Sequence, residues 1–452
     1  MSLESGELHI EEQLLQKTLE HALANVKFYG KAVQRAGHLS SPSLKDFPII
    51  DKNTVEANFE DFLYLDRFPD YVISSGGTMA GAGAFSLRAQ EEYEAIYFHN
   101  SGRHPRKRYE YFSPDGFAID LFTHTNGYHW RKPPGLPVLP FTLEQEAHAL
   151  FLVHILRDGL PIQGHRCYPV HLQGQCGPMR TLTGYIDVLG EKVIPASSSL
   201  GTLVYGSHTT RVWKDRYQSI WGSRPRELYG LSEFAPGSAQ QCDTCGGFHF
   251  RTCWTEFLAL DNDEPTNFGD ARLVLTSLFP FVQMQPRIRY YTGDIVSVGG
   301  VCPATGRISF KFRGREKNSV LSRGDDKTVL FSEVEVQEVL DQMKSVACQT
   351  QVSELRIWES TNLPKPPYAL GYPRFQILIE EKEETTLACI EIEVTFEPDV
   401  EKQKSGHFRE LFAGLLFCEA PGIEEAINSG CLSLNISLMP QNSLRLNVKS
   451  SA

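Results

Sequence analysis

The sequence predicts an α/β fold with a large N-terminal domain and a small α+β C-terminal domain. Between residues 70 and 300, short apolar runs alternate with longer helical patterns, for example FAIDLF, LPVLPF and RLVLTSLF with LEQEAHALFLVHILRDG and TTRVWKDRYQSIWG. This alternation favours mainly parallel sheets with crossover helices. After about residue 315 a helical segment, SEVEVQEVLDQM, is followed by β-rich stretches and by a second helix around HFRELFAGLLF. Together they form a unit of about 130 residues, enough for its own core. We therefore predict domains at 1–314 and 315–452.

The first elements follow from periodicity and capping. Apolar residues recur at helical spacing over residues 8–36, and Gly37 with the segment HLSSPS ends the pattern. The extended segment LKDFPII leads to Asp51, whose carboxylate is suited to cap the next helix. These signals predict helices at the start of the N-terminal domain.

A glycine-rich stretch, SSGGTMAGAGAF at residues 74–85, follows the apolar run YVI. Glycine tolerates positive φ, so backbone N–H groups in such a loop can face an anion, and the hydroxyl groups add donors. The stretch is not a P-loop, because Ala82 and Gly83 stand where that motif requires a lysine and a hydroxyl. Taken alone, it is either a phosphate-binding loop or an ordinary turn.

Composition and charge exclude several classes of function. The chain has 452 residues, of which 41% are hydrophobic and 22% charged, as in soluble globular proteins. A net charge of -11 and the lack of a basic stripe argue against nucleic-acid binding. The N-terminus does not read as a signal peptide, and no apolar run reaches the length of a membrane span. We therefore expect a cytoplasmic protein that binds neither nucleic acid nor a membrane.

Three further motifs carry groups suited to a nucleotide. ELYGLSEF, at 227–234, offers Tyr229 for stacking on a planar ring and Glu233 for a hard cation such as Mg²⁺. RIRYYTGDI ends in a Gly-Asp turn, where Asp294 could accept hydrogen bonds from paired ribose hydroxyls. KFRGREKNSVLSRGDD adds Arg315, which could bind a phosphate or a sugar oxygen. Each motif alone is also typical of an ordinary turn or hairpin.

The order of these motifs, followed by a small C-terminal domain, resembles the adenylate-forming superfamily of acyl-CoA synthetases, adenylation domains and luciferases. HALANVKFYGKAVQRAG and LKDFPIIDKNTV resemble the opening of its phenylacetate-CoA ligase-like branch. The resemblance spans most of residues 20–340 and fades beyond 345. It implies that the C-terminal domain is a mobile lid with a hinge at Lys317.

The resemblance also implies a role for each matched residue. Glu233 is implied to hold Mg²⁺ and, with the lid lysine, to serve catalysis. The matched residues are, for the ATP phosphates, Ser74, Ser75, Gly76, Gly77, Thr78 and Gly81; for AMP, Tyr229, Gly230, Ser232, Asp294 and Arg315; for the acyl pocket, His124, Tyr128, Gly206 and Ser207; and for the lid lysine, Lys449.

The implied reaction is ATP-dependent activation of a carboxylic acid. The carboxylate attacks the α-phosphate of ATP, pyrophosphate leaves, and the acyl group passes from AMP to a thiol, for which CoA is the first expectation. The aromatic residues of THTNGYHW (123–130) suit an aryl or related planar acid, although ordinary core aromatics are the alternative. The alternatives stay open: an amine or a carrier-protein thiol as the acceptor, a nucleotide-binding protein that has lost its chemistry, and a homodimer.

Three departures from the family pattern stand out. Ala82 replaces the lysine that usually follows the second glycine of the phosphate loop, and Ser232 replaces a threonine but keeps the hydroxyl. The tail MPQNSLRLNVKSSA has no clear GKxxR sequence, so Lys449 is the nearest candidate for the lid lysine. The loop is therefore expected to bind phosphate through backbone and hydroxyl donors.

The ten cysteines are expected to be mostly reduced, but several of them cluster. QCDTCGGFHFRTCW contains Cys242, Cys245, His249 and Cys253, and Cys302 follows later. Zn²⁺ prefers four tetrahedral sulfur and nitrogen ligands, although ordinary reduced thiols are the alternative. By resemblance to phenylacetate-CoA ligase-like proteins, Cys242, Cys245, His249 and Cys302 form the expected set, with Cys253 as a spare. Such a site is expected to be structural.

Overall fold

The computed structural model describes residues 3–36, 42–64, 68–74, 85–101, 116–122, 138–162, 164–190, 200–235, 237–324, 327–350, 357–358 and 362–444. The chain forms two compact units. Unit 1 comprises Met1–Glu110, Asn126–Pro134 and Leu228–Glu316, and unit 2 comprises Tyr111–Thr125, Gly135–Glu227 and Lys317–Ala452. The predicted α/β fold with a small C-terminal domain is confirmed. The structure adds that unit 2 joins this C-terminal region to residues 135–227.

Helices and short 3-10 turns begin unit 1. They are α1 (Leu3–Asn25), α2 (Lys27–Ala36), η1 (Leu44–Asp46), α3 (Lys52–Ala57), η2 (Phe59–Phe62) and α4 (Gln90–Ser101). The helical pattern over 8–36 breaks at Val26, beside Asn25, whose side-chain amide donates to the His21 carbonyl oxygen at 2.9 Å. The predicted cap at Asp51 is confirmed, because its carboxylate accepts the Thr54 N–H at 2.8 Å.

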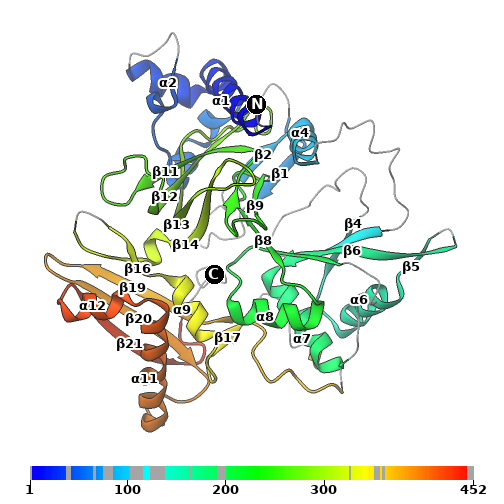
Figure 1. Ribbon diagram of the computed structural model, residues 1–452, viewed down its shortest axis with the longest axis vertical. Helices are drawn as coiled ribbons and strands as arrows, with labels where there is room; N and C mark the ends of the chain where they lie inside the picture. Colours follow the sequence, from blue (N-terminus) through cyan, green and yellow to red (C-terminus); the bar gives the residue numbers. More distant parts are fainter. Residues whose placement is uncertain are drawn as a thin grey trace. The chain divides into compact units, whose positions relative to one another are not determined.

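Antiparallel strands make up the rest of unit 1 (Figure 1). A hairpin of β1 (Tyr71–Ser74) and β2 (Phe85–Arg88) stands by itself. The larger set runs in the order β11-β12-β13-β14-β10-β9-β8. Its strands are β8 (Arg226–Gly230), β9 (Ser238–Gln241), β10 (Phe248–His249), β11 (Cys253–Ala259), β12 (Gly269–Ser277), β13 (Tyr290–Val301) and β14 (Ile308–Arg315). Buried apolar residues of α1 and α2 pack with those of β11 to β14 in one core.

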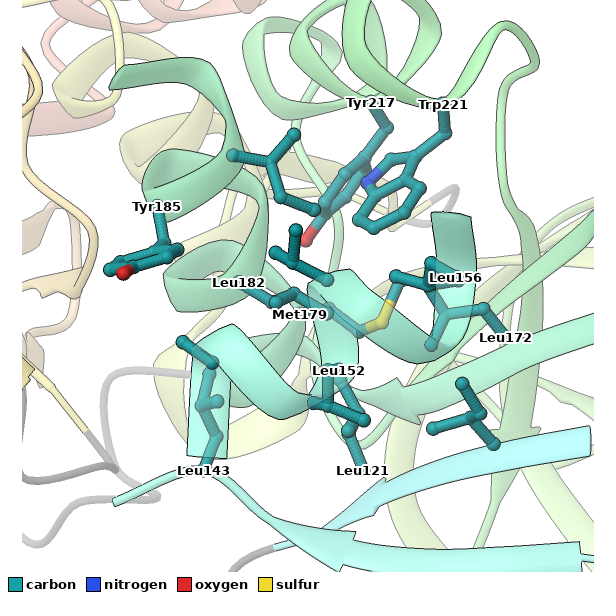
Figure 2. Packing of buried hydrophobic residues seen from close by; sticks show 14 of the residues in the cluster. Leu121, Leu143, Leu152, Leu156, Leu172, Met179, Leu182, Tyr185, Tyr217 and Trp221 are labelled. Carbon is teal, nitrogen blue, oxygen red and sulfur yellow. The ribbon is translucent and has the colours of Figure 1, made fainter. Parts of the chain in front are cut away.

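The predicted parallel sheet lies in unit 2. The strands β7 (Gly201–Tyr205), β6 (His165–Gln175), β3 (Gly116–Phe122) and β4 (Val138–Thr142) are parallel in that order, and β5 (Leu160–Ile162) pairs with β6 in the antiparallel sense. The helices of this part are α6 (Glu146–Asp158), α7 (Cys176–Leu189) and α8 (Arg211–Trp221). Figure 2 shows their shared core, in which Leu152, Met179 and Leu182 from the helices lie near Leu121 and Leu172 from the strands.

The C-terminal region of unit 2 has its own three-stranded sheet. In this sheet β19 (Phe375–Glu381) and β20 (Thr386–Val394) are antiparallel, and β21 (Leu432–Pro440) is parallel to β20. The parallel pairing follows from the crossover through α11 (Lys402–Glu419) and α12 (Gly422–Asn428). The remaining elements are η4 (Glu316–Asn318), which spans the change of unit, β15 (Val320–Leu321), β16 (Val329–Phe331), α9 (Glu333–Leu340), β17 (Cys348–Gln349) and β18 (Tyr372–Pro373).

Capping and packing account for these C-terminal elements. The helix predicted from SEVEVQEVLDQM is α9, which Ser332 caps by accepting the Val334 N–H at 3.1 Å. The helix predicted around HFRELFAGLLF is α11. Both helices bury apolar residues against β19, β20 and β21 in one core. Among the helices that the structure describes, none combines the length and apolarity needed to cross a membrane.

Candidate functional site

Tyr229 and Asp294 meet where β8 ends and β13 begins. The Tyr229 hydroxyl donates to Asp294 Oδ2. The Tyr229 ring packs edge-on against Phe250 and Phe310, with ring centroids 5.9 and 5.5 Å away. Burial, and then the Asp294 carboxylate, raise the pKa of Tyr229, so it stays a neutral donor near neutral pH. Aromatic packing thus sets the position of the ring, and the hydroxyl orients Asp294.

Asp294 and Arg315 form an ion pair across β13 and β14. The Arg315 Nε atom lies 2.9 Å from Asp294 Oδ1, and the side chains of the two residues are 41% and 1% exposed. The predicted Gly-Asp turn is wrong, because Gly293 and Asp294 lie inside β13. Gly293 has φ +77°, a conformation that side chains rarely tolerate, so this position of the strand requires glycine. Burial raises the pKa of Asp294, and Arg315 opposes that shift. The structure therefore brings together Tyr229, Asp294 and Arg315.

The turn after β8 carries Glu233. Its backbone oxygen accepts a hydrogen bond from Arg88 Nη2, and its carboxylate Oε1 accepts one from the Tyr290 hydroxyl at 3.2 Å. Gly230 is the last residue of β8, and Ser232 lies half-buried within the turn. These contacts fix a half-buried carboxylate beside the strand that carries Asp294.

Several predicted residues lie outside the described part of the chain, namely Ser75, Gly76, Gly77, Thr78, Gly81, His124, Tyr128 and Lys449. Their roles stay predictions. Ser74 is described as the last residue of β1, where it stands opposite Phe85 of β2.

Three other predicted site residues, Gly206, Ser207 and Lys317, belong to unit 2. The Ser207 hydroxyl donates to the Tyr372 hydroxyl at 2.8 Å, and its backbone oxygen accepts from Cys176 Sγ at 3.3 Å. Gly206, before it, has φ +94°. Lys317 is the first residue of unit 2 after Glu316, so the change of unit falls at the predicted hinge.

Sequence reasoning missed two buried arginines of unit 1, Arg88 and Arg287. Their exposed fractions are 0% and 1%. Arg88 is the last residue of β2, and its Nε donates to the Ala235 backbone oxygen at 2.9 Å. The sequence does contain a signal for their burial, because each arginine belongs to a short stretch with apolar residues, FSLR for Arg88 and RIRY for Arg287.

The first cysteine turn joins β9 to β10. The Cys242 N–H donates to the Gly247 oxygen and the Gly246 N–H donates to the Cys242 oxygen, both at 2.8 Å. Gly246 has φ +68°, which a residue with a side chain rarely adopts. The turn places Cys245 three residues after Cys242.

The second turn, between β13 and β14, repeats this hydrogen-bond pattern. The Cys302 N–H donates to the Arg307 oxygen and the Gly306 N–H donates to the Cys302 oxygen, both at 2.8 Å. Cys302 therefore corresponds to Cys242. Thr305 stands at the position that corresponds to Cys245, so this turn supplies one thiol instead of two.

The four predicted metal ligands converge. The ligand atoms of Cys242, Cys245, His249 and Cys302 all lie within 4.8 Å of one another. Cys242 Sγ and Cys302 Sγ are 3.8 Å apart, and Cys245 Sγ lies 3.2 Å from His249 Nε2. A tetrahedron with metal–sulfur bonds of about 2.3 Å has sulfur–sulfur edges of about 3.8 Å. The arrangement can thus offer three thiolates and one imidazole to a single ion.

The surroundings of Cys302 and His249 favour the forms that bind metal, whereas burial raises the pKa of the Cys245 thiol. Burial raises the pKa of Cys302, but the Thr305 hydroxyl and the Ala304 backbone outweigh it and lower that pKa to about 7. Burial lowers the pKa of His249, which keeps the imidazole neutral. Cys253 is not part of the group, and burial raises its thiol pKa to about 12.

Of the comparisons with known proteins, only the one with solved structures found similar proteins. No protein-family model matches the chain, and no curated protein matches it. A structure of 2-hydroxyisobutyryl-CoA ligase in the postadenylation state, in complex with 2-HIB-AMP, matches with a TM-score of 0.60 and 16% identity over 96% of this chain and 86% of that one. The chain shares the fold of this ligase.

Two further structures of that ligase also share the fold of this chain. An open conformation with 2-HIB-AMP and CoA has a TM-score of 0.59 and 16% identity over 96% of this chain and 88% of that one. The thioesterification state has a TM-score of 0.54 and 16% identity over 99% of this chain and 89% of that one. The match therefore extends through both units of the chain.

Proposed function

We propose that this chain is an adenylate-forming ligase that uses ATP to activate a carboxylic acid and then transfers the acyl group to the thiol of CoA. The observation that carries the proposal is the contact of Tyr229, Asp294 and Arg315, with Glu233 on the neighbouring turn, in a chain of adenylate-forming fold. The ligase with that fold was solved in complex with 2-HIB-AMP and CoA, which supports both half-reactions.

The first half-reaction forms an acyl-adenylate. A carboxylate oxygen of the acid bonds to the α-phosphorus of ATP, while the bond from that phosphorus to the bridging oxygen breaks and pyrophosphate leaves. In the second half-reaction the thiol sulfur bonds to the acyl carbon, AMP leaves, and the thiol proton passes to solvent. Because the nucleotide supplies the leaving group, the chain's own task is to position the reactants and stabilise charge.

Asp294 accepts hydrogen bonds from the ribose hydroxyls in this proposal. Its carboxylate is buried and already oriented by Tyr229 on one oxygen and by Arg315 near the other. Arg315 is partly exposed, so its guanidinium can exchange Asp294 for a ribose or phosphate oxygen. Tyr229 contributes a ring at the AMP site and holds the aspartate in place.

Glu233 is the residue that holds Mg²⁺. Its turn is anchored by Arg88 and Tyr290, so the carboxylate is held in place before any ligand binds. When bound, the ion neutralises negative charge on the phosphates.

The identity of the acid and the motion of the lid belong to the same proposal. An aryl or related planar acid remains the first choice, and a carrier-protein thiol or an amine remains the alternative acceptor. Residues 315–452 serve as the lid, with Lys449 as its lysine. The change of unit between Glu316 and Lys317 supports the hinge.

We also propose a structural Zn²⁺ on Cys242, Cys245, His249 and Cys302. The sulfur–sulfur distance of 3.8 Å and the matching turns support it. The ion would join the turn between β9 and β10 to the turn between β13 and β14. With four protein ligands it has no open position for catalysis.

Pyrophosphate release tests the function. The protein is mixed with ATP, magnesium and a panel of aryl and aliphatic acids, and pyrophosphate is measured with and without each acid. We expect acid-dependent release with at least one acid, and a thioester once CoA is added. ATP binding without release for any acid would contradict the ligase and favour a protein that only binds nucleotide. Release without a thioester would reject CoA as the acceptor.

A further inference from the structure

The guanidinium group of Arg287 is buried without a matching anion. Its side chain is 1% exposed, and within the described residues Nε and Nη1 have no hydrogen-bond partner. The Phe62 ring centroid lies 5.9 Å from Arg287 Cζ, which gives weak electrostatic attraction but no hydrogen-bond acceptor. A buried cation is unfavourable unless an anion pairs with it. Within the described residues no carboxylate accepts from these two N–H groups, so they remain available to an added negative group.

A second buried cation makes the excess of positive charge larger. Burial first, and the charge of Arg88 second, lower the pKa of Arg287 to about 10, against an opposing effect of Glu233. Arg88 uses its own N–H groups on the backbone oxygens of Leu87, Glu233 and Ala235, and none of those oxygens carries a charge. The two cations therefore share the influence of the Glu233 carboxylate.

The buried carboxylate of Glu92 does not balance Arg287. Glu92 Oε2 accepts the Ala89 N–H at 2.9 Å, and Oε1 accepts the backbone N–H groups of Gln283 and Met284. A carboxylate held by several backbone donors is already stabilised as an anion. The Glu92 carboxylate therefore stabilises backbone N–H groups at the start of α4 and in the segment between β12 and β13.

Gln285 adds a further donor without a partner. It is fully buried, and its Oε1 accepts the Leu87 N–H at 3.3 Å. Within the described residues, its Nε2 has no hydrogen-bond partner. Gln285 and Arg287 are two residues apart. Gln285 is bonded to Leu87 of β2, and Arg287 is close enough to Arg88 of β2 for the two charges to interact. Unpaired N–H donors of an amide and a guanidinium therefore gather beside this strand.

The same strand lies next to a sequence motif of the proposed nucleotide site. Ser74 of β1, the first residue of the glycine-rich stretch, stands opposite Phe85 of β2. Arg88, at the end of β2, also holds the turn of Glu233. The unpaired donors thus lie close to β2, and the charge of Arg287 interacts with Glu233, the residue expected to hold the magnesium ion.

We infer that Arg287 and Gln285 form the binding site for the terminal phosphates of ATP and for the pyrophosphate that leaves. This inference rests on the proposed function. It gives a ligand role to two residues, Arg287 and Gln285, that had none in the sequence motifs. Arg287 supplies the positive charge that is missing from the glycine-rich loop, where Ala82 stands in place of lysine. A guanidinium pairs well with phosphate oxygens, and burial strengthens the interaction.

Calorimetric titration of the full chain with AMP, ATP and sodium pyrophosphate tests the site. The variants are Arg287→Leu, Arg287→Lys and Gln285→Leu, with Arg224→Leu as the control, because the Arg224 side chain is 63% exposed. We expect Arg287→Leu to weaken ATP and pyrophosphate by about tenfold or more, while AMP changes by less than about twofold. Arg287→Lys should recover part of the loss, and Gln285→Leu should show a smaller loss with the same selectivity.

Thermal unfolding gives a second readout that a structural arginine would not produce. Arg287→Leu should unfold at the same temperature as the wild type or higher, because it removes an unpaired buried charge. Pyrophosphate should raise the unfolding temperature of the wild type and of Arg224→Leu, but not of Arg287→Leu.

Each other result overturns the inference. If the folded Arg287→Leu variant binds ATP and pyrophosphate as the wild type does, Arg287 is not the phosphate ligand, and the proposed function still stands. Equal losses for AMP and ATP would mean that the arginine is structural. If Arg287→Leu does not fold, Arg287→Lys and Gln285→Leu decide by the same comparison. A wild type that binds no nucleotide would overturn both this inference and the proposed function.

Discussion

Two buried arginines, Arg180 in unit 2 and Arg287 in unit 1, differ in how many hydrogen-bond and ion-pair partners their guanidinium groups have. In unit 2, Arg180 is 0% exposed, its Nη2 lies 3.3 Å from Asp341 Oδ2, and its Nη1 donates to the Gly371 oxygen at 2.9 Å. Its Cζ lies 4.8 Å from the Trp213 ring centroid and 4.4 Å from that of Tyr372. In the described structure only its Nε lacks a hydrogen-bond partner.

Arg287 of unit 1 has none of these partners. Burial lowers the pKa of Arg180 as well, but Asp341 and its neighbours outweigh burial and raise it above its ordinary value. For Arg287, burial and Arg88 act in the same direction and lower the pKa to about 10. A charge that is satisfied inside the protein serves stability, whereas a charge left unsatisfied is available to a ligand.

The largest effect should come from breaking the satisfied pair. Asp341→Ala leaves the Arg180 guanidinium buried without its carboxylate, and we expect a loss of about 3–5 kcal/mol in the free energy of unfolding, measured in urea. Asp341 also accepts from the Thr210 hydroxyl at 2.7 Å. Thr210→Val is therefore the control, with an expected loss of about 1 kcal/mol. A loss in Asp341→Ala no larger than in the control would contradict the contrast with Arg287.

Metal removal tests the second proposed ligand site of unit 1, which is the zinc site of three cysteines and one histidine. We expect about one equivalent of zinc in protein purified without chelator, and little in Cys302→Ser. Protein at a free zinc concentration about a hundredfold above the dissociation constant should be more stable than metal-free protein. The expected difference in the free energy of unfolding is about 2.7 kcal/mol.

The cysteines outside the group provide controls for the metal. Cys253→Ser tests the spare ligand directly, and Cys418→Ser removes an exposed thiol. Both should keep the zinc of the wild type. Zinc below about a tenth of an equivalent in the wild type would reject the site.

A smaller effect concerns a buried carboxylate in unit 2 that has no cation as a partner in the described structure. Asp120 accepts from the Tyr205 hydroxyl at 2.9 Å, and burial raises its pKa to about 6 despite that bond and one from Gln173. An unfolded aspartate has a pKa of about 3.9, so in this window the folded state binds the extra proton. This carboxyl therefore contributes stability below about pH 4 that is lost as the pH rises through about 6.

Asp120→Asn isolates that dependence. The amide oxygen can still accept from Tyr205, and no proton is exchanged. The free energy of unfolding of each protein is measured at pH 4 and at pH 7. The difference, variant minus wild type, should be about 2 kcal/mol larger at pH 7 than at pH 4. A difference between the two proteins that does not change with pH would show that Asp120 is ionised throughout this range.

The sequence predicts local features of this molecule better than distant pairs. The caps at Asp51 and Ser332 and the two cysteine turns depend on a few neighbouring residues, so local sequence is enough to indicate each of them. Arg180 and Asp341 are 161 positions apart, and Arg88 contacts Glu233 across 145 positions. No local pattern links such residues.

Strand direction and burial explain the remaining differences. Apolar runs in β11 to β14 resemble those of parallel strands, but these strands are antiparallel because they follow one another through short connections instead of crossover helices. Arg287 sits one residue before an apolar position of the RIRYYTGD motif, and its burial becomes visible only when α1 and α2 cover β12 and β13.

The smallest effect would come from returning the missing cation to the loop. Ala82→Lys should tighten ATP binding by only about threefold in the wild type, because Arg287 already supplies positive charge to the terminal phosphates. In the Arg287→Leu background the same change should recover about tenfold, so the two substitutions are coupled. Titration with ATP measures both effects, and AMP serves as the reference ligand. Equal gains in the two backgrounds would mean that Arg287 and the loop act on different groups. A loss of ATP binding in Ala82→Lys would mean that residues 74–85 do not hold the phosphates.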